Sequence, residues 1–88
     1  MKRYRVDYSD DAEDDLHAIG LYLAAEASVP VAERFVEGLI ARCEKLANYP
    51  ERGARRHEAA GLRTISHKKS VLIAYRVGEE VVTVVGLL

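Results

Sequence analysis

The pattern of apolar and polar positions predicts a strand followed by two helices in the first half of the 88-residue chain. Apolar and polar residues alternate over residues 3–8, RYRVDY, as they do in a half-buried strand. Apolar residues then recur every three or four positions over residues 12–27 and 32–47, which predicts two amphipathic helices. Because only a short break at residues 28–30 separates them, the two helices should form an antiparallel αα-hairpin.

Three strand-like segments follow the helices, at residues 62–66, 71–77 and 81–88. Gly78 and Glu79 make a tight turn between the last two segments. The order of elements is therefore β-α-α-β-β-β. We expect one α+β domain over residues 1–88, in which the αα-hairpin packs on a small antiparallel sheet.

The last segment, VVTVVGLL at residues 81–88, has almost no polar side chain. A strand that is apolar on both faces needs cover on both faces. We therefore expect that another polypeptide covers this strand or that the natural chain continues beyond it. An exposed end of this composition would favour aggregation.

Composition restricts the class of protein. Hydrophobic residues make up 49% of the chain and charged residues 31%, which is ordinary for a globular domain and too apolar for a disordered one. No apolar run approaches the roughly 20 residues that span a bilayer, and the N-terminus lacks the apolar stretch of a signal peptide. The single cysteine, Cys43, excludes an internal disulfide and falls on the apolar stripe of the second helix, so we expect a cytoplasmic protein with Cys43 in its core.

The net charge of −1 conceals a strong asymmetry along the chain. Residues 7–26 hold seven Asp and Glu and no Lys or Arg, whereas residues 52–76 hold seven Lys and Arg against one Glu. The acidic block is explained by the dipole at the start of a helix, which favours negative charge. The basic block has no such explanation, and it predicts a charged partner for this half of the protein.

Motifs for cofactor or metal binding are absent from the sequence. Neither a G-x-G-x-x-G nor a G-x-x-x-x-G-K-S/T loop occurs. The three histidines, His17, His57 and His67, are far apart, and Cys43 has no C-x-x-C partner. The sequence therefore predicts no metal and no cofactor.

The basic hairpin at residues 61–80 is the remaining candidate site. Arg63 precedes a loop that contains His67, Lys68 and Lys69, and Arg76 follows it. Cleavage of RNA without a metal needs a general base and cations that hold the phosphate charge, and these five residues are the candidates for it. The same residues are also compatible with a docking surface for an acidic partner or with a solvated turn. Tyr75, which follows the core pattern of its strand, is expected to pack rather than to react.

Three segments carry a resemblance to a known family: YRVDYSDDAEDDLHAIGLYL at the start, LANYPERG after the second helix, and GLRTISHKKSVLIAYRVGEEVVTVV at the end. In this order they resemble the RelE/ParE superfamily of toxins from bacterial type II toxin–antitoxin modules, and its ParE branch more than its RelE branch. The resemblance covers essentially the whole chain.

The resemblance implies a cytoplasmic toxin that a cognate antitoxin holds inactive. The partly disordered C-terminal segment of the antitoxin would fold around the toxin and cover its apolar surface. The residues expected to contact it are Leu16, Leu23, Val82, Val84, Leu87 and Leu88.

Toxins of the ParE branch are associated with inhibition of DNA gyrase, and those of the RelE branch with ribosome-dependent cleavage of mRNA. We expect a non-enzymatic gyrase inhibitor that binds its target through Arg63, His67, Lys68 and Lys69. The alternatives are a RelE-like endoribonuclease, with Arg76 added to this set, and a non-toxic homologue that only binds its antitoxin. The RelE branch also uses an Arg and a Tyr near the C-terminus, and these have no counterpart in a sequence that ends at Leu88.

Overall fold

The computed structural model describes residues 2–56 and 59–88, so His57 lies outside the described part. No helix in these two ranges is long and apolar enough to cross a membrane. The elements follow in the order β1 (Arg5–Tyr8), α1 (Asp10–Glu26), α2 (Val29–Glu44), the 3-10 turns η1 (Lys45–Ala47) and η2 (Pro50–Arg52), β2 (Ala54–Arg55), β3 (Leu62–His67), β4 (Val71–Val77) and β5 (Val81–Leu87).

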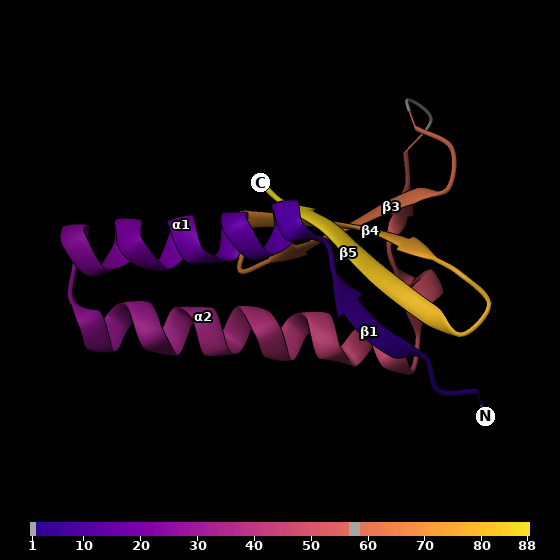
Figure 1. Cartoon of the computed structure of the whole chain (residues 1–88), viewed down its shortest axis with the longest axis horizontal. Coiled ribbons are helices and arrows are strands. Elements are labelled where there is room, and N and C mark those ends of the chain that lie inside the picture. Colours follow the sequence, from indigo (N-terminus) through magenta and orange to yellow (C-terminus); the bar gives the residue numbers. More distant parts are fainter. Residues whose placement is uncertain (1, 57–58) are drawn as a thin grey trace.

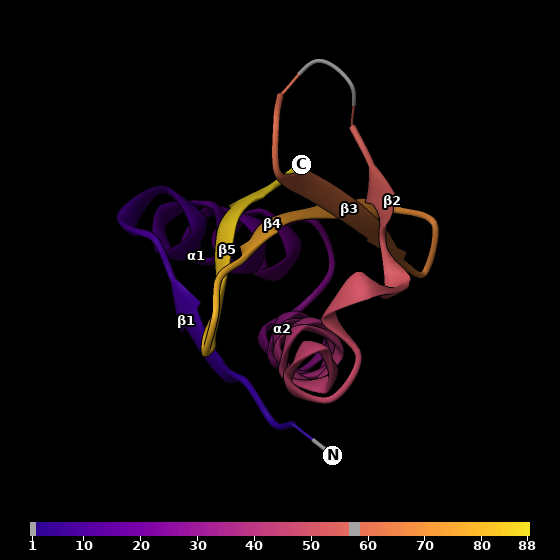
Figure 2. The same cartoon turned by 90° about the vertical axis from the view of Figure 1, so that its right-hand side faces the viewer.

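The two helices form an antiparallel pair that packs on one face of a five-stranded sheet (Figure 1). The sheet is strongly curved, and its concave face wraps around α2 (Figure 2). This arrangement confirms the predicted α+β architecture with an αα-hairpin over a small sheet. The far end of the hairpin extends beyond the sheet (Figure 1). Leu21, Tyr22 and Val29 of the two helices are exposed.

The sheet differs from the prediction in one pairing and one strand. The strand order is β1-β5-β4-β3-β2, and β1 pairs with β5 in parallel, with Val6 opposite Val82, so the sheet is mixed rather than wholly antiparallel. Strands β2 to β5 form an antiparallel meander that leaves the outer edge of β5 unpaired, and the first strand fills that edge. The extra strand, β2, has two residues, which is too short to show an alternating pattern.

A serine caps the N-terminus of each helix, directly before its first residue. The Ser9 hydroxyl accepts a hydrogen bond from the amide of Ala12 at 3.1 Å, and the Ser28 hydroxyl accepts one from the amide of Val31 at 3.2 Å. Each bond satisfies an amide that has no partner within its helix, which typically stabilises the helix by about 1 kcal/mol. Pro30 lies in the first turn of α2, where its missing N–H costs nothing.

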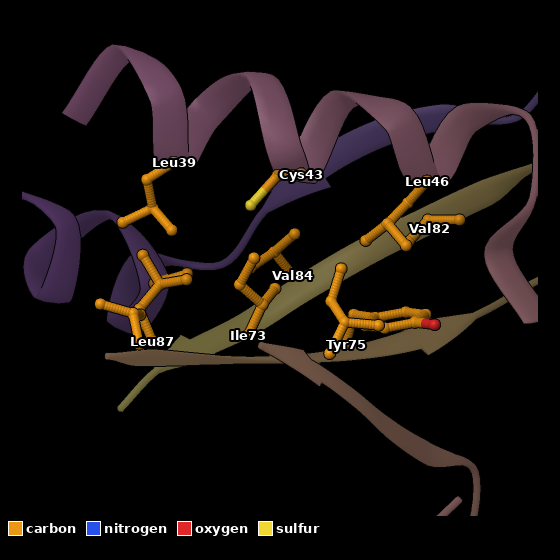
Figure 3. Packing of buried hydrophobic residues seen from close by; sticks show 11 residues of the cluster. Leu39, Cys43, Leu46, Ile73, Tyr75, Val82, Val84 and Leu87 are labelled. Atoms are coloured by element: carbon orange, nitrogen blue, oxygen red, sulfur yellow. The ribbon is translucent and has the colours of Figure 1, made fainter. Parts of the chain in front are cut away.

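The core lies between α2 and the sheet (Figure 3). From α2 and the turn after it come Leu39, Cys43 and Leu46, and Ile73 and Tyr75 of β4 face them. All five side chains are at most 1% exposed, and burying an apolar side chain of this size stabilises a fold by about 1.5–3 kcal/mol. The prediction that Cys43 is a core residue is confirmed.

Strand β5 is covered by the protein itself on its inner face. Val82 and Val84 are 0% exposed beneath the helices, whereas Val81, Thr83 and Val85 on the other face are half-buried. The expectation that the whole strand lacks cover is therefore wrong for the inner face, because alternate side chains of a strand point to opposite faces.

Strand β5 extends past the end of β1, and side chains at the start of α1 form hydrogen bonds with the backbone groups that remain unpaired along its outer edge. The Ser9 hydroxyl donates to the carbonyl oxygen of Val85 at 3.2 Å, and the Asp15 carboxylate accepts from the amide of Leu87 at 3.0 Å. Asp15 therefore has a structural role in addition to its favourable charge near the start of the helix. An edge that is capped in this way is protected from pairing with another strand.

Candidate functional site

The loop that precedes β2 is anchored to the core by Tyr75. Its buried hydroxyl donates to the carbonyl oxygen of Pro50 at 2.6 Å and accepts from the amide of Gly53 at 2.9 Å. A side chain at position 53 would clash with this hydroxyl and lie 2.8 Å from the carbonyl oxygen of Thr64, so only glycine fits here. Tyr75 thus packs in the core, as its position in the strand pattern predicts, and its hydroxyl in addition anchors the loop.

The anchored loop holds Arg63 in place in turn. One guanidinium nitrogen of Arg63 donates to the carbonyl oxygens of Glu51 at 3.1 Å and Gly53 at 2.9 Å. Nearby, the Arg56 guanidinium donates to the hydroxyl of Thr64 at 2.9 Å, and Arg76 donates to the carbonyl oxygen of Ala60. Each guanidinium carries five N–H donors, so each of the three keeps donors available for a ligand.

Three arginines line one hollow of about 720 Å³ at this end of the sheet. We call it the arginine hollow; Arg55, Arg56 and Arg63 supply its charge, Glu51 is its acidic side chain, and its main apolar side chains are Tyr4, Leu62 and Val77. Arg55 and Arg56 were not among the predicted site residues. The basic block over residues 52–76 was the signal that could have identified them.

The structure divides the predicted basic site between the two ends of β3. Arg63 lies beside Arg76 at one end, where Leu62 is paired with Arg76 and Arg63 with Tyr75. His67 lies at the other end, opposite Val71. Four residues of strand place the Cα atoms of Arg63 and His67 about 13 Å apart. The five residues therefore do not form one site.

His67 faces helix α2 instead of joining the lysines that follow it. It is 7% exposed, its ring packs edge-to-face on Phe35 with centroids 5.4 Å apart, and its Nε2 atom has no hydrogen-bond partner among the described residues. Burial, and then the charges of Lys68 and Arg42, lower the pKa of His67 below its ordinary value. The prediction that places His67 in the loop with the two lysines is wrong, because β3 and its alternation continue through this residue and turn it inward.

Lys68 and Lys69 form the β3–β4 turn in an uncommon conformation. Their φ angles are 51° and 61°, and the amide of Ser70 donates to the carbonyl oxygen of His67 at 3.0 Å to close the turn. A β-turn whose two central residues have positive φ values favours Asn-Gly, and each ordinary residue in this region costs about 1 kcal/mol. Both lysines are exposed. Strain of this kind is found preferentially at functional positions.

A second, apolar hollow of about 400 Å³ lies between α1 and the end of the sheet. We call it the apolar hollow; its larger side chains are Ile19, Tyr22, Leu23, Phe35, Val71, Leu87 and Leu88. Tyr22 is 65% exposed and Leu88 78% exposed, so its rim is open to a partner.

The predicted antitoxin contacts fall into three groups. Leu23, Leu87 and Leu88 meet in the apolar hollow, and Leu16 is half-buried in a separate shallow depression of α1. Val82 and Val84 are fully buried in the core and offer no surface to a partner. The prediction is corrected for these two valines, because the helices of the protein itself already cover them.

The described residues contain no group of three side chains suited to holding a metal ion. What the structure presents instead is a small α+β domain with an arginine hollow at one end of its sheet and an apolar hollow at the other.

Comparison with known proteins identifies the class. The family described as ParE toxin of the type II toxin–antitoxin system parDE matches residues 6–88, and the chain belongs to this family. It is therefore a toxin of the RelE/ParE superfamily, as the sequence predicts. A search of curated protein sequences found no match.

Two solved structures share the fold. One is from the chromosomal ParDE system of P. aeruginosa, with a TM-score of 0.85, 20% sequence identity, and coverage of 97% of this chain and 94% of that chain. The other is from the toxin–antitoxin complex RelBE2 of Mycobacterium tuberculosis, with a TM-score of 0.72, 20% identity, and coverage of 100% and 92%.

Proposed function

We propose that this toxin acts in the cytoplasm by binding and inhibiting DNA gyrase, and that it does not cleave RNA. The observation that carries the proposal is the burial of His67. A metal-free nuclease needs a group that takes the proton of the 2′-hydroxyl, and His67 was the candidate for this step on the basic hairpin. Its ring is 7% exposed and packs edge-to-face on Phe35, so it offers almost no surface to an RNA. Membership of the ParE family supports the gyrase alternative.

The cognate antitoxin is the second partner in this proposal, and the apolar hollow is its docking surface. Tyr22 and Leu88 are large apolar side chains that stand open to solvent at the rim, and the half-buried Leu23 lines the same hollow. An amphipathic segment of the antitoxin can bury this surface through regularly spaced apolar anchors. Both structural neighbours come from toxin–antitoxin systems, which supports a partner of this kind.

Two assays on the purified protein separate the alternatives. Gyrase inhibition is measured by supercoiling of a relaxed plasmid, and nuclease activity by cleavage of an mRNA during translation on ribosomes. We expect inhibition of supercoiling, no cleavage, and full activity in the variant His67→Leu. Cleavage of mRNA that is lost in His67→Leu would refute the proposal and establish the RelE-like alternative.

Expression of the chain in bacteria without the antitoxin gives the matching test in cells. Gyrase inhibition predicts filamentous cells with a DNA-damage response, whereas ribosomal cleavage predicts an immediate arrest of protein synthesis. Normal growth with abundant folded protein would instead support the non-toxic homologue. Co-expression with the antitoxin should restore growth, and replacing Tyr22 and Leu88 with aspartate should prevent this rescue.

A further inference from the structure

The arginine hollow contains like charges that the fold has placed against each other. Arg55 of β2 lies directly opposite Arg63 of β3 in the strand register, and Arg56 lines the same hollow. Directly opposed side chains of a strand pair are about 5 Å apart at their Cβ atoms, and like charges at this distance destabilise the pair. Within residues 2–56 and 59–88, the only ion pair is that of Arg5 with Asp7, so no described carboxylate forms an ion pair with these arginines.

Two of the three guanidinium groups are also oriented by hydrogen bonds to the protein. Arg63 is bound to two carbonyl oxygens of the loop that Tyr75 anchors, and Arg56 is bound to Thr64. Side chains that are already ordered lose less entropy when a ligand binds. The planar fork of a guanidinium suits two-point binding of a carboxylate or a phosphate group. The arrangement is therefore suited to an anionic ligand.

The lining of the hollow distinguishes between kinds of anion. The side chains of Tyr4, Leu62 and Val77 add apolar surface beside the arginines, and Glu51 opposes a dense row of negative charges. The protein also carries seven Asp and Glu within residues 7–26, which repel an extended polyanion that reaches beyond the hollow. A short peptide segment with one or two carboxylates and apolar neighbours satisfies both parts of the lining.

We propose that the arginine hollow is the docking site for an acidic segment of a protein partner, in which an Asp or Glu carboxylate binds between Arg55 and Arg63 and an adjacent apolar side chain packs on Leu62 and Val77. The adjoining strand β2 lies at the edge of the sheet, so its outer side is open to such a segment. This inference depends on the proposed function in one respect: it takes the protein partner to be the toxin's target.

The test measures binding of a fluorescein-labelled peptide in which Asp alternates with Leu and Phe, by fluorescence anisotropy at about 150 mM salt. The control ligands are the same peptide with Asn in place of Asp and a single-stranded oligothymidine of equal charge. The double variant R55Q/R56Q removes two charges from the arginine hollow. Its matched control is K68Q/K69Q, which removes two charges at the other end of β3.

We expect the acidic peptide to bind the wild-type protein, and R55Q/R56Q to weaken this binding by about tenfold or more. The control K68Q/K69Q should change it by less than about twofold, because lysines about 13 Å or more away are screened at this salt concentration. The variant R55K/R56K, which keeps the charge and loses the fork, should show an intermediate loss. It also covers the case in which R55Q/R56Q does not fold, which circular dichroism would show.

Three results would overturn the inference: no binding of the acidic peptide, equal losses in R55Q/R56Q and K68Q/K69Q, or tighter binding of the oligothymidine that depends on Arg55 and Arg56. The last result would assign the hollow to nucleic acid. Peptide binding by a protein that leaves gyrase uninhibited would refute the proposed function and leave the docking site standing, so the two failures are distinguishable.

Discussion

Replacing His67 with leucine should leave the protein as stable as the wild type or more stable, and should leave its toxicity unchanged. The wild-type ring is 7% exposed, and its Nε2 atom has no partner within the described residues. A buried polar atom without a hydrogen bond costs about 1–3 kcal/mol, and leucine removes this atom while keeping the apolar contact with Phe35. We expect a gain of up to about 1 kcal/mol, or about 4–8 °C in melting temperature for a domain of this size. His67→Ala, which leaves a cavity, should instead lose about 2 kcal/mol.

The same residue predicts a pH dependence of the free energy of unfolding. Burial, followed by the charges of Lys68 and Arg42, lowers the pKa of His67 in the folded protein. The unfolded chain therefore binds a proton more readily, so stability is full above the ordinary histidine pKa of about 6.5 and falls as the pH drops through and below it. The slope contributed by one group is at most about 1.4 kcal/mol per pH unit.

Urea unfolding of the wild type, His67→Leu and His67→Ala between about pH 5 and pH 8 measures both effects. Both variants should lack the part of the slope that His67 contributes. The control His17→Gln, which removes an exposed histidine of α1, should keep it. A folded His67→Leu protein that has lost toxicity would refute the purely structural role of this ring. If the free energy of unfolding depends on pH in the two His67 variants as it does in the wild type, the burial of His67 is refuted.

Two further predictions concern the anchor and the turn. Tyr75→Phe removes the hydroxyl that binds the loop before β2, so we expect the free energy of unfolding to fall by about 2–3 kcal/mol and the melting temperature to fall with it. The control Tyr49→Phe, at an exposed ring, should leave both unchanged. An unchanged melting temperature in Tyr75→Phe would contradict the anchoring role. The double variant Lys68→Asn/Lys69→Gly should raise the free energy of unfolding in urea by about 1–2 kcal/mol, because Asn and Gly adopt positive φ angles at a lower cost than lysine. If the turn contacts the target, the same variant should also inhibit gyrase less; no gain in stability would show that the turn is not strained.

Local signals in the sequence were sufficient to predict the helices, the core position of Cys43 and the presence of a basic block. These features depend on residues that are close in the chain: a helical period, a stripe position and a count of charges. The inward direction of His67 is also encoded locally, since Ile65 and His67 are two positions apart and therefore lie on the same face of one strand. A strand predicted to end at residue 66 leaves His67 in the loop instead.

Only the tertiary structure decided which of these residues act together. The parallel pairing of β1 with β5, the two-residue strand β2 and the meeting of Arg55 with Arg63 all join segments through contacts distant in sequence. Their pairing depends on how the sheet closes around α2, and no short-range pattern records it. The sequence by itself determined that positive charge gathers in the second half of the chain; the folded sheet determined that part of it forms a hollow and that the rest lies about 13 Å or more away on a strained turn.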